Sequence, residues 1–245
     1  MSTRRAKQLI YGALYALIVV IFCGIVYLLF IYPSANTPVF VCTPSSCAPT
    51  GTAPIAVGPV VTFVTSPGQY TFLAQVTNEN PDYGAPVLDY AIDLDDASGT
   101  VVRSIPAQSF IYQAQSKYLA VLNQAVSQPF DHAELAITSA SWLPSSTIGV
   151  IPAIAPGQFA VQNVEAVVGS TTVSVGGQLV NTSVATYGQV LVLVIFNGPD
   201  GDPAGVSQTE LNDVAAGSTS NFSVIYPVEP NIDPALNQIV VYALR

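Results

Sequence analysis

The chain has 245 residues, of which 50% are hydrophobic, and it is acidic: six Lys and Arg stand against fifteen Asp and Glu, for a formal net charge of −9. Three of the basic residues precede residue 8, and the other three are Arg103, Lys117 and Arg245. A surface with this excess of carboxylates repels phosphate groups. The composition therefore argues against nucleic acid as a partner.

Residues 9–32 form an apolar segment without a single Asp, Glu, Lys or Arg. A helix of this length, at about 1.5 Å per residue, measures roughly 36 Å and can cross a hydrocarbon core of about 30 Å. Arg4, Arg5 and Lys7 lie in the preceding segment 1–8, and the next charged residue is Glu79. This distribution predicts a single-pass signal anchor in the cell membrane, with the N-terminus cytoplasmic and the C-terminal domains extracytoplasmic.

Two other kinds of N-terminal segment share part of this pattern. A cleaved signal peptide has an apolar region of about 7–15 residues that ends in a small-residue site. Here the apolar segment is longer and continues into Tyr32-Pro33-Ser34-Ala35. A type IV pilin needs a Glu shortly after its cleavage point, whereas Glu79 is the first Glu of this chain. We therefore favour an uncleaved anchor that contacts the lipid bilayer through residues 9–32.

Residues 33–54 are rich in Pro, Ser, Thr and Ala, which predicts an extended and partly stiff stalk. Cys42 and Cys47 lie in this stalk, while Cys23 lies within the apolar segment. In an oxidising extracytoplasmic compartment, a local disulfide between Cys42 and Cys47 is the first interpretation. Two cysteines without further ligands nearby argue against a zinc site.

The remaining residues are rich in Val, Thr, Ala, Ser, Gly and Pro, the composition of an all-β protein. Their number suits two β-sandwich domains, for which we expect residues 55–150 and 155–245. In residues 88–95, Leu, Tyr, Ile and Leu alternate with Asp, Ala, Asp and Asp, which predicts a strand with its acidic side chains toward solvent. Trp142 and Tyr242 are expected in the cores. The other expected strand segments are 70–78, 100–102, 109–112, 118–122, 133–142, 178–183, 190–196, 221–226 and 239–242.

An internal repeat is visible in the order of local features. Tyr83-Gly84 and Tyr187-Gly188 each follow a turn that contains Asn and precede an alternating apolar strand, which ends in a turn rich in Asp and Gly. We interpret the two copies as a diverged repeat of about 100 residues.

This order of features resembles the bacterial FxLYD-type domain, an immunoglobulin-like sandwich. Residues 92–96 (Ile-Asp-Leu-Asp-Asp) and 193–197 (Leu-Val-Ile-Phe-Asn) occupy the motif position, and Asn78–Ala85 is the more specific similarity. The layout of a basic start, one anchor, a cysteine-bearing segment and β domains also resembles uncharacterised envelope proteins of small-genome bacteria. The resemblance implies two tandem immunoglobulin-like β-sandwich domains after an N-terminal transmembrane helix, and it implies no activity.

The sequence contains few patterns typical of catalytic or metal-binding sites. The single histidine, His132, is flanked by Asp131 and Glu134, and we interpret it as an exposed residue at a strand start. No Gly-x-Ser-x-Gly elbow, phosphate loop or HExxH motif is present. The stretches 93–99 and 197–202 carry the oxygen ligands that Ca²⁺ prefers, but neither has the spacing of an EF-hand loop, and we interpret both as turns. The sequence thus predicts no catalytic residue, no metal ligand and no cofactor.

The function that these features favour is non-enzymatic: a membrane-anchored protein that presents two β-sandwich domains to a protein partner at the cell envelope. The alternative is a structural spacer or a self-associating subunit of an envelope assembly. An enzyme is the third possibility, and no residue constellation supports it.

Overall fold

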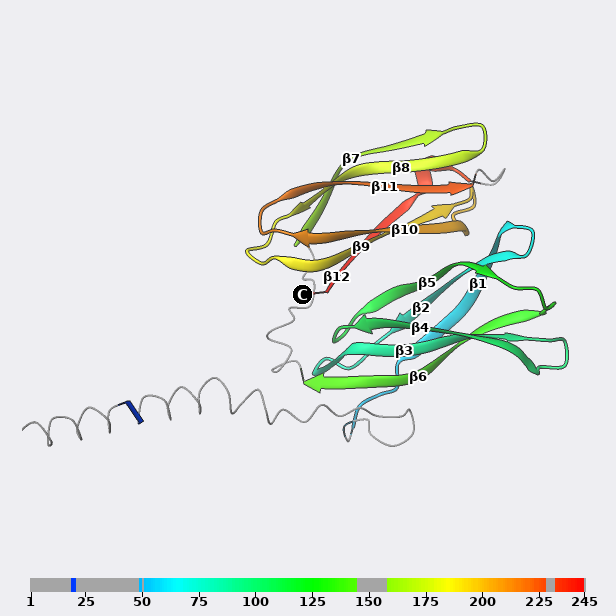
Figure 1. The fold of residues 1–245 in the computed structure, drawn as a ribbon, viewed down its shortest axis with the longest axis horizontal. Coiled ribbons are helices and arrows are strands. Elements are labelled where there is room, and N and C mark those ends of the chain that lie inside the picture. Colours follow the sequence, from blue (N-terminus) through cyan, green and yellow to red (C-terminus); the bar gives the residue numbers. More distant parts are fainter. Residues whose placement is uncertain (1–18, 21–48, 50, 145–157, 228–231, 245) are drawn as a thin grey trace, which may run out of the picture. The chain divides into compact units, whose positions relative to one another are not determined.

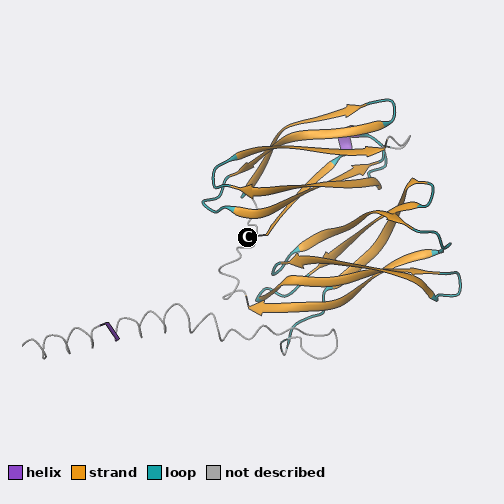
Figure 2. Ribbon diagram, in the orientation of Figure 1, coloured by secondary structure: helices purple, strands orange, loops and turns teal. Residues whose placement is uncertain are grey.

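The computed structural model describes residues 19–20, 49, 51–144, 158–227 and 232–244 (Figure 1). Nearly all of them lie in strands and the turns between strands (Figure 2), so the all-β prediction is confirmed. No helix within this part of the chain is long and apolar enough to span a bilayer. Of the predicted anchor, only residues 19 and 20 are described, and both are helical. The basic residues of segment 1–8 and the pair Cys42 and Cys47 lie outside the described residues, as does most of the stalk.

Residues 51–144, called here the N-terminal half, form two three-stranded antiparallel sheets with the orders β1-β2-β5 and β4-β3-β6. Their strands are β1 (Ala56–Ser66), β2 (Gln69–Thr77), β3 (Tyr83–Asp95), β4 (Val101–Ile111), β5 (Ser116–Ala125) and β6 (His132–Pro144).

Residues 158–244, called here the C-terminal half, form two more sheets, with the orders β7-β8-β11 and β10-β9-β12. A short 3₁₀ helix, η3 (Pro234–Leu236), precedes the last strand. Strand for strand, this connectivity repeats that of the N-terminal half. The strands are β7 (Phe159–Val168), β8 (Thr172–Asn181), β9 (Tyr187–Asn197), β10 (Pro203–Val214), β11 (Thr219–Pro227) and β12 (Gln238–Leu244).

Each half has a hydrophobic core of its own, as expected of a sandwich-like arrangement. In the N-terminal half, Phe72 of β2 and Leu88 of β3 are fully buried in one cluster that also contains Trp142 of β6. In the C-terminal half, Val175 of β8 and Val192 of β9 are members of a second cluster. Side chains from both sheets of each half thus share one core, which removes their apolar surface from water. The core position predicted for Trp142 is confirmed.

A third cluster joins the two halves, which belong to one compact unit of residues 41–245. Phe110 and Tyr112 of the N-terminal half pack there with Ile195 and Tyr242 of the C-terminal half. The Tyr112 hydroxyl donates a hydrogen bond to the carbonyl oxygen of Ala243 at 2.7 Å. The Tyr118 N–H donates one to the Tyr242 hydroxyl, also at 2.7 Å. Tyr242 is therefore buried as predicted, in the contact between the halves.

Equivalent buried asparagines mark the repeat. Asn78 follows β2 and Asn181 ends β8, and both side chains are inaccessible to solvent. The Asn78 amide donates to the carbonyl oxygens of Tyr83 and Tyr112, and the Asn181 amide donates to those of Ala185 and Ala215. Each asparagine thus ties the end of its strand to the backbone of later segments, which satisfies buried carbonyl groups.

Two expectations about strands were wrong. Residues 100–102 and 109–112 were expected as separate segments, but β4 is continuous through Pro106. Strand β4 is at the edge of its sheet, which is where proline is tolerated within a strand. Strands β1, β7 and β10 were not predicted, since none shows a sustained alternation of apolar and polar residues.

The acidic residues of β3 also differ from the prediction. Asp89 and Asp93 are partly exposed, as expected for a solvated face, but Asp95 is buried, with 6% of its surface exposed. The backbone pairing of β3 with β6 places Asp95 directly opposite His132, and the His132 imidazole approaches the Asp95 carboxylate. The local sequence of β3 contains no sign of this partner.

Candidate functional site

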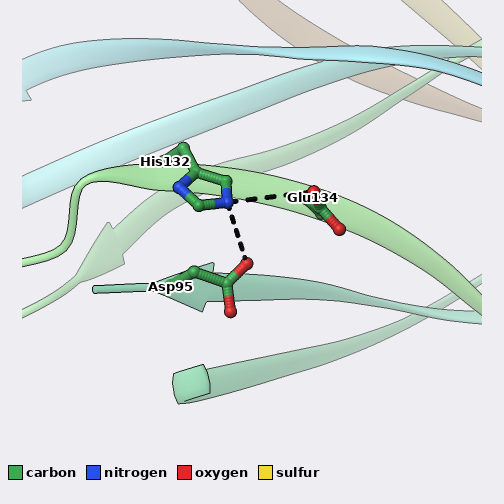
Figure 3. A group of neighbouring side chains, drawn as sticks. All are labelled: Asp95, His132 and Glu134. Atoms are coloured by element: carbon green, nitrogen blue, oxygen red, sulfur yellow. Dashed lines mark ion pairs between the residues drawn. The ribbon is translucent and has the colours of Figure 1, made fainter. Parts of the chain in front are cut away.

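A group of one imidazole and two carboxylates lies where β3 ends and β6 begins (Figure 3). His132 and Glu134 are two residues apart on β6, so their side chains project from the same face of the strand. Asp95 pairs with His132 across the β3–β6 ladder and therefore projects from that same face. Strand register alone thus brings the three side chains together.

Both carboxylates approach the same ring nitrogen. The distance from His132 Nε2 to Asp95 Oδ2 is 3.4 Å, and the distance to Glu134 Oε1 is 3.8 Å (Figure 3). One oxygen or nitrogen atom from each of the three residues lies within 4.8 Å of the other two. The second ring nitrogen, Nδ1, faces Asp131 Oδ2 at 3.7 Å. Each imidazole nitrogen therefore faces carboxylate oxygen.

The three side chains differ strongly in their exposure. The side chain of Asp95 is 8% exposed, against 47% for His132 and 73% for Glu134. A buried carboxylate is normally satisfied by hydrogen-bond donors. Within the described residues no hydrogen bond reaches the Asp95 carboxylate, and its partner at 3.4 Å is the imidazole.

Within residues 51–144, no lysine or arginine side chain compensates these carboxylates. Residues 51–144 contain two basic residues, Arg103 and Lys117. The Arg103 guanidinium donates a hydrogen bond to the carbonyl oxygen of Ala125, and Lys117 Nζ donates to Ser109 Oγ and to the carbonyl oxygen of Phe110. The group around His132 therefore holds more negative than positive charge even when the imidazole is protonated.

A surface depression adjoins the group. Residues 57–60 of β1 and 132–135 of β6 line a volume of about 450 Å³. Strand β1 carries a register irregularity between Val57 and Val60, which displaces its backbone at this point. Solvent and small ligands therefore reach the exposed side of the imidazole.

The stretches 93–99 and 197–202 each begin at the end of a strand, β3 or β9, and continue into a turn. Asp96 Oδ1 accepts hydrogen bonds from Ser98 Oγ at 2.6 Å and from the N–H groups of Ser98 and Thr100. These bonds, that of the Ser98 hydroxyl first, lower the pKa of the Asp96 carboxyl below its usual value. In the second stretch, the N–H of Gly201 donates to the carbonyl oxygen of Gly198. The Asp96 carboxylate therefore stabilises the turn through these hydrogen bonds.

Lys117 is a buried lysine and the second candidate position in the N-terminal half. It is 1% exposed, and its Nζ lies 3.2 Å from the centroid of the Phe110 ring and 4.9 Å from that of Tyr242. Burial lowers the pKa of the Lys117 amine well below its usual value. Sequence patterns do not single out this lysine, because its burial depends on the contact between the two halves.

Sequence reasoning found part of the His132 group. It noted Asp131, His132 and Glu134 as neighbours in the chain and placed His132 at a strand start, as observed. It did not connect them with Asp95, because that contact depends on the pairing register of β3 and β6. Cys42 and Cys47, as well as Arg4, Arg5 and Lys7, lie outside the described residues.

Comparison with known proteins gives no family. No family model matches the chain, and no curated protein matches it. A crystal structure of red sea bream transglutaminase is similar over 71% of this chain and 26% of that chain, with 14% identity and a TM-score of 0.24. Oxalate decarboxylase from Bacillus subtilis is similar over 82% and 78% of the two chains, with 8% identity and a TM-score of 0.12. This chain spans about a quarter of the transglutaminase, and scores this low support no conclusion about fold family or activity.

Proposed function

We propose that this chain is a membrane-anchored extracytoplasmic protein that presents two tandem immunoglobulin-like β-sandwich domains to a protein partner at the cell envelope, without enzymatic activity. The uncharged segment 9–32 and its basic flank support the anchor and its orientation. The strand orders support the domain type. In an immunoglobulin sandwich, the first, second and fifth strands share a sheet, as β1, β2 and β5 do, and β3 and β6 correspond to strands C and F of the other sheet.

The observation that carries the binding role is a sheet edge in the C-terminal half with which no further described strand pairs. Strand β7 is at the end of its sheet and pairs with β8 on one side. Three valines on it are exposed: Val164 at 49%, Val167 at 52% and Val168 at 56%. An edge strand with apolar side chains in solvent favours the addition of a strand from another chain. The partner that fits this edge is an extended peptide segment of a protein.

A pull-down from detergent-solubilised envelope tests this function, with the intact chain and a version that starts at Pro54 as baits. We expect a stoichiometric partner with both baits, because the binding surface lies on the β halves. A partner lost on truncation would move the function to the anchor or to the stalk around Cys42 and Cys47. Self-association of the intact chain without any partner would contradict the binding role and favour the structural spacer.

A matched pair of substitutions locates the surface. Val167→Lys places a charge on the β7 edge and is expected to abolish capture of the partner. Val101→Lys is the control, because Val101 is also 52% exposed and lies on the edge strand β4 of the other half. Equal capture by the two variants would place the binding surface elsewhere.

A further inference from the structure

We propose that Asp95, His132 and Glu134 bind one divalent transition-metal ion, that the donor set fits Zn²⁺, and that Asp131 orients the imidazole. The proposal does not depend on the protein partner proposed above. It is based on the donor geometry, on the burial of Asp95, on the position of Asp131 and on the local charge.

Two of the three donor pairs are close to the spacing that zinc requires, and the third lies within 4.8 Å. Zinc binds imidazole nitrogen and carboxylate oxygen at about 2.0–2.2 Å in tetrahedral geometry, so neighbouring donors lie about 3.4 Å apart. The distance from His132 Nε2 to Asp95 Oδ2 is 3.4 Å, and that to Glu134 Oε1 is 3.8 Å. The exposed Glu134 side chain is free to rotate toward the ion, while Asp95 and the backbone stay in place. Three protein donors then leave a fourth position open toward the depression beside β1.

Asp95 supplies an independent reason for a cation. Its side chain is more than nine-tenths buried, its carboxylate accepts no hydrogen bond within the described residues, and it faces the imidazole. A buried carboxylate is costly unless it is paired with a cation or coordinates a metal. His132 is nearby at 3.4 Å, but that distance exceeds the usual length of a hydrogen bond. A metal ion between the two groups would satisfy both.

Asp131 is placed as the outer partner of a metal-bound histidine. Its Oδ2 faces His132 Nδ1 at 3.7 Å, on the opposite side of the ring from Asp95 and Glu134. Histidines that bind a metal through one nitrogen usually donate the other N–H to a carboxylate or carbonyl group, which fixes the tautomer and the ring orientation. The Asp131 side chain is 67% exposed and can approach the ring further.

The donor types decide between classes of ion. Mg²⁺ and Ca²⁺ prefer oxygen ligands alone, whereas imidazole suits zinc and its neighbours in the first transition row. The basic side chains of the N-terminal half bond elsewhere, to Ala125, Ser109 and Phe110, so none occupies the place of the cation. We therefore expect Zn²⁺ to bind and millimolar Ca²⁺ not to displace it.

The test is a titration of ZnCl₂ into the full chain, purified in detergent without a histidine tag and freed of metal. Cys42 and Cys47 are replaced by Ser in every sample, so that no thiolate outside the described residues binds zinc. Competition with a chromogenic chelator measures the stoichiometry and the affinity. We expect one Zn²⁺ per chain, with an affinity reduced at least about tenfold in His132→Ala and in Glu134→Gln and about tenfold in Asp131→Asn.

Glu165→Gln is the matched control, because Glu165 is an exposed acid on edge strand β7 and its removal changes the net charge by the same amount. It is expected to leave the affinity unchanged. X-ray absorption at the zinc edge should show one imidazole nitrogen at about 2.0–2.1 Å with oxygen ligands. The chain has one histidine, so that signal identifies His132. No saturable binding, an affinity unchanged in His132→Ala, or a zinc spectrum without imidazole would overturn the proposal.

Discussion

At the scale of single residues, Lys117 places an amine between the two halves without a carboxylate partner among the described residues. The unfolded chain takes up a proton at the ordinary lysine pKa of about 10.4, whereas burial lowers the pKa of Lys117 in the folded chain. Between these two values the unfolded chain binds more protons, so the free energy of unfolding rises with pH, by up to about 1.4 kcal/mol per pH unit.

Urea unfolding between pH 7 and 9.5 tests this dependence. This window avoids the tyrosines, because burial raises the pKa of Tyr90 and of Tyr242 to about 12, and their contribution to stability is lost as pH rises from about 10 to 12. We expect stability to increase with pH in the parent chain and to be nearly constant in Lys117→Met. The same slope in both would contradict the assignment to Lys117.

The buried asparagines carry a second prediction at this scale. Asn78→Ala leaves the carbonyl oxygens of Tyr83 and Tyr112 without their donors in a buried environment. We expect a loss of about 2–4 kcal/mol in the free energy of unfolding. Asn181→Ala should cost a similar amount, because its amide bonds are equivalent. Chemical denaturation measures both.

The control for these variants is Asn212→Ala, since Asn212 is an exposed residue of β10. It should change stability by no more than about 0.5 kcal/mol. A cost for Asn78→Ala as small as that of the control would show that the buried amide is dispensable.

At the scale of the elements, β10 passes close to β11. A Cβ atom at Gly205 of β10 would overlap the ring of Tyr226, which is itself stacked on Phe196 with 5.1 Å between ring centroids. Gly205→Ala should therefore destabilise the chain by about 1–3 kcal/mol through overpacking. Gly188→Ala on β9 is the control, because nothing lies within 4 Å of a Cβ at that position. Equal thermal midpoints for the two variants would refute the close contact.

The elements also show which features the sequence could predict. The alternating apolar residues of the sequence predicted β3 and β9, because each strand buries one face along its length. The turn residues Asn, Asp and Gly indicated where these strands end. Strand β7 has no such alternation because most of its side chains are exposed. Strands β1 and β10 mix buried, partly buried and exposed side chains without a regular period of two. The Asp95–His132 contact could not be predicted from local sequence patterns, because it depends on the pairing register of β3 and β6. The alternation of apolar and polar residues therefore predicted the all-β fold class. The candidate site depends on the pairing register of β3 and β6, which the sequence does not reveal.

At the scale of the whole molecule, the cluster between the halves predicts cooperative unfolding. Tyr112 and Tyr242 each contribute apolar surface and one hydrogen bond to the other half. We expect one calorimetric transition for the parent chain. The double variant Tyr112→Phe, Tyr242→Phe loses both hydrogen bonds, at about 1–3 kcal/mol each, and should separate the transition into two. Two transitions already in the parent would contradict the coupling.

Tyr83→Phe is the control for that experiment. Its hydroxyl makes no hydrogen bond with the described residues, so the single transition should be retained. A separation in this variant as well would mean that the loss of any tyrosine hydroxyl, rather than the contact between the halves, uncouples the two parts.

The most direct measurement for the central claim, that an anchored chain presents its β halves outside the membrane, is cysteine labelling of intact cells with a membrane-impermeant maleimide. Val184, which is fully exposed between β8 and β9, is replaced by Cys in one variant, and Ser2 in another, both with Cys42 and Cys47 changed to Ser. We expect Val184→Cys to be labelled in intact cells, Ser2→Cys only after lysis, and the protein to stay with the membrane in alkaline carbonate. Absence of maleimide labelling of Val184→Cys in intact cells, or release of the protein from the membrane by carbonate, would contradict the proposed anchor and its orientation.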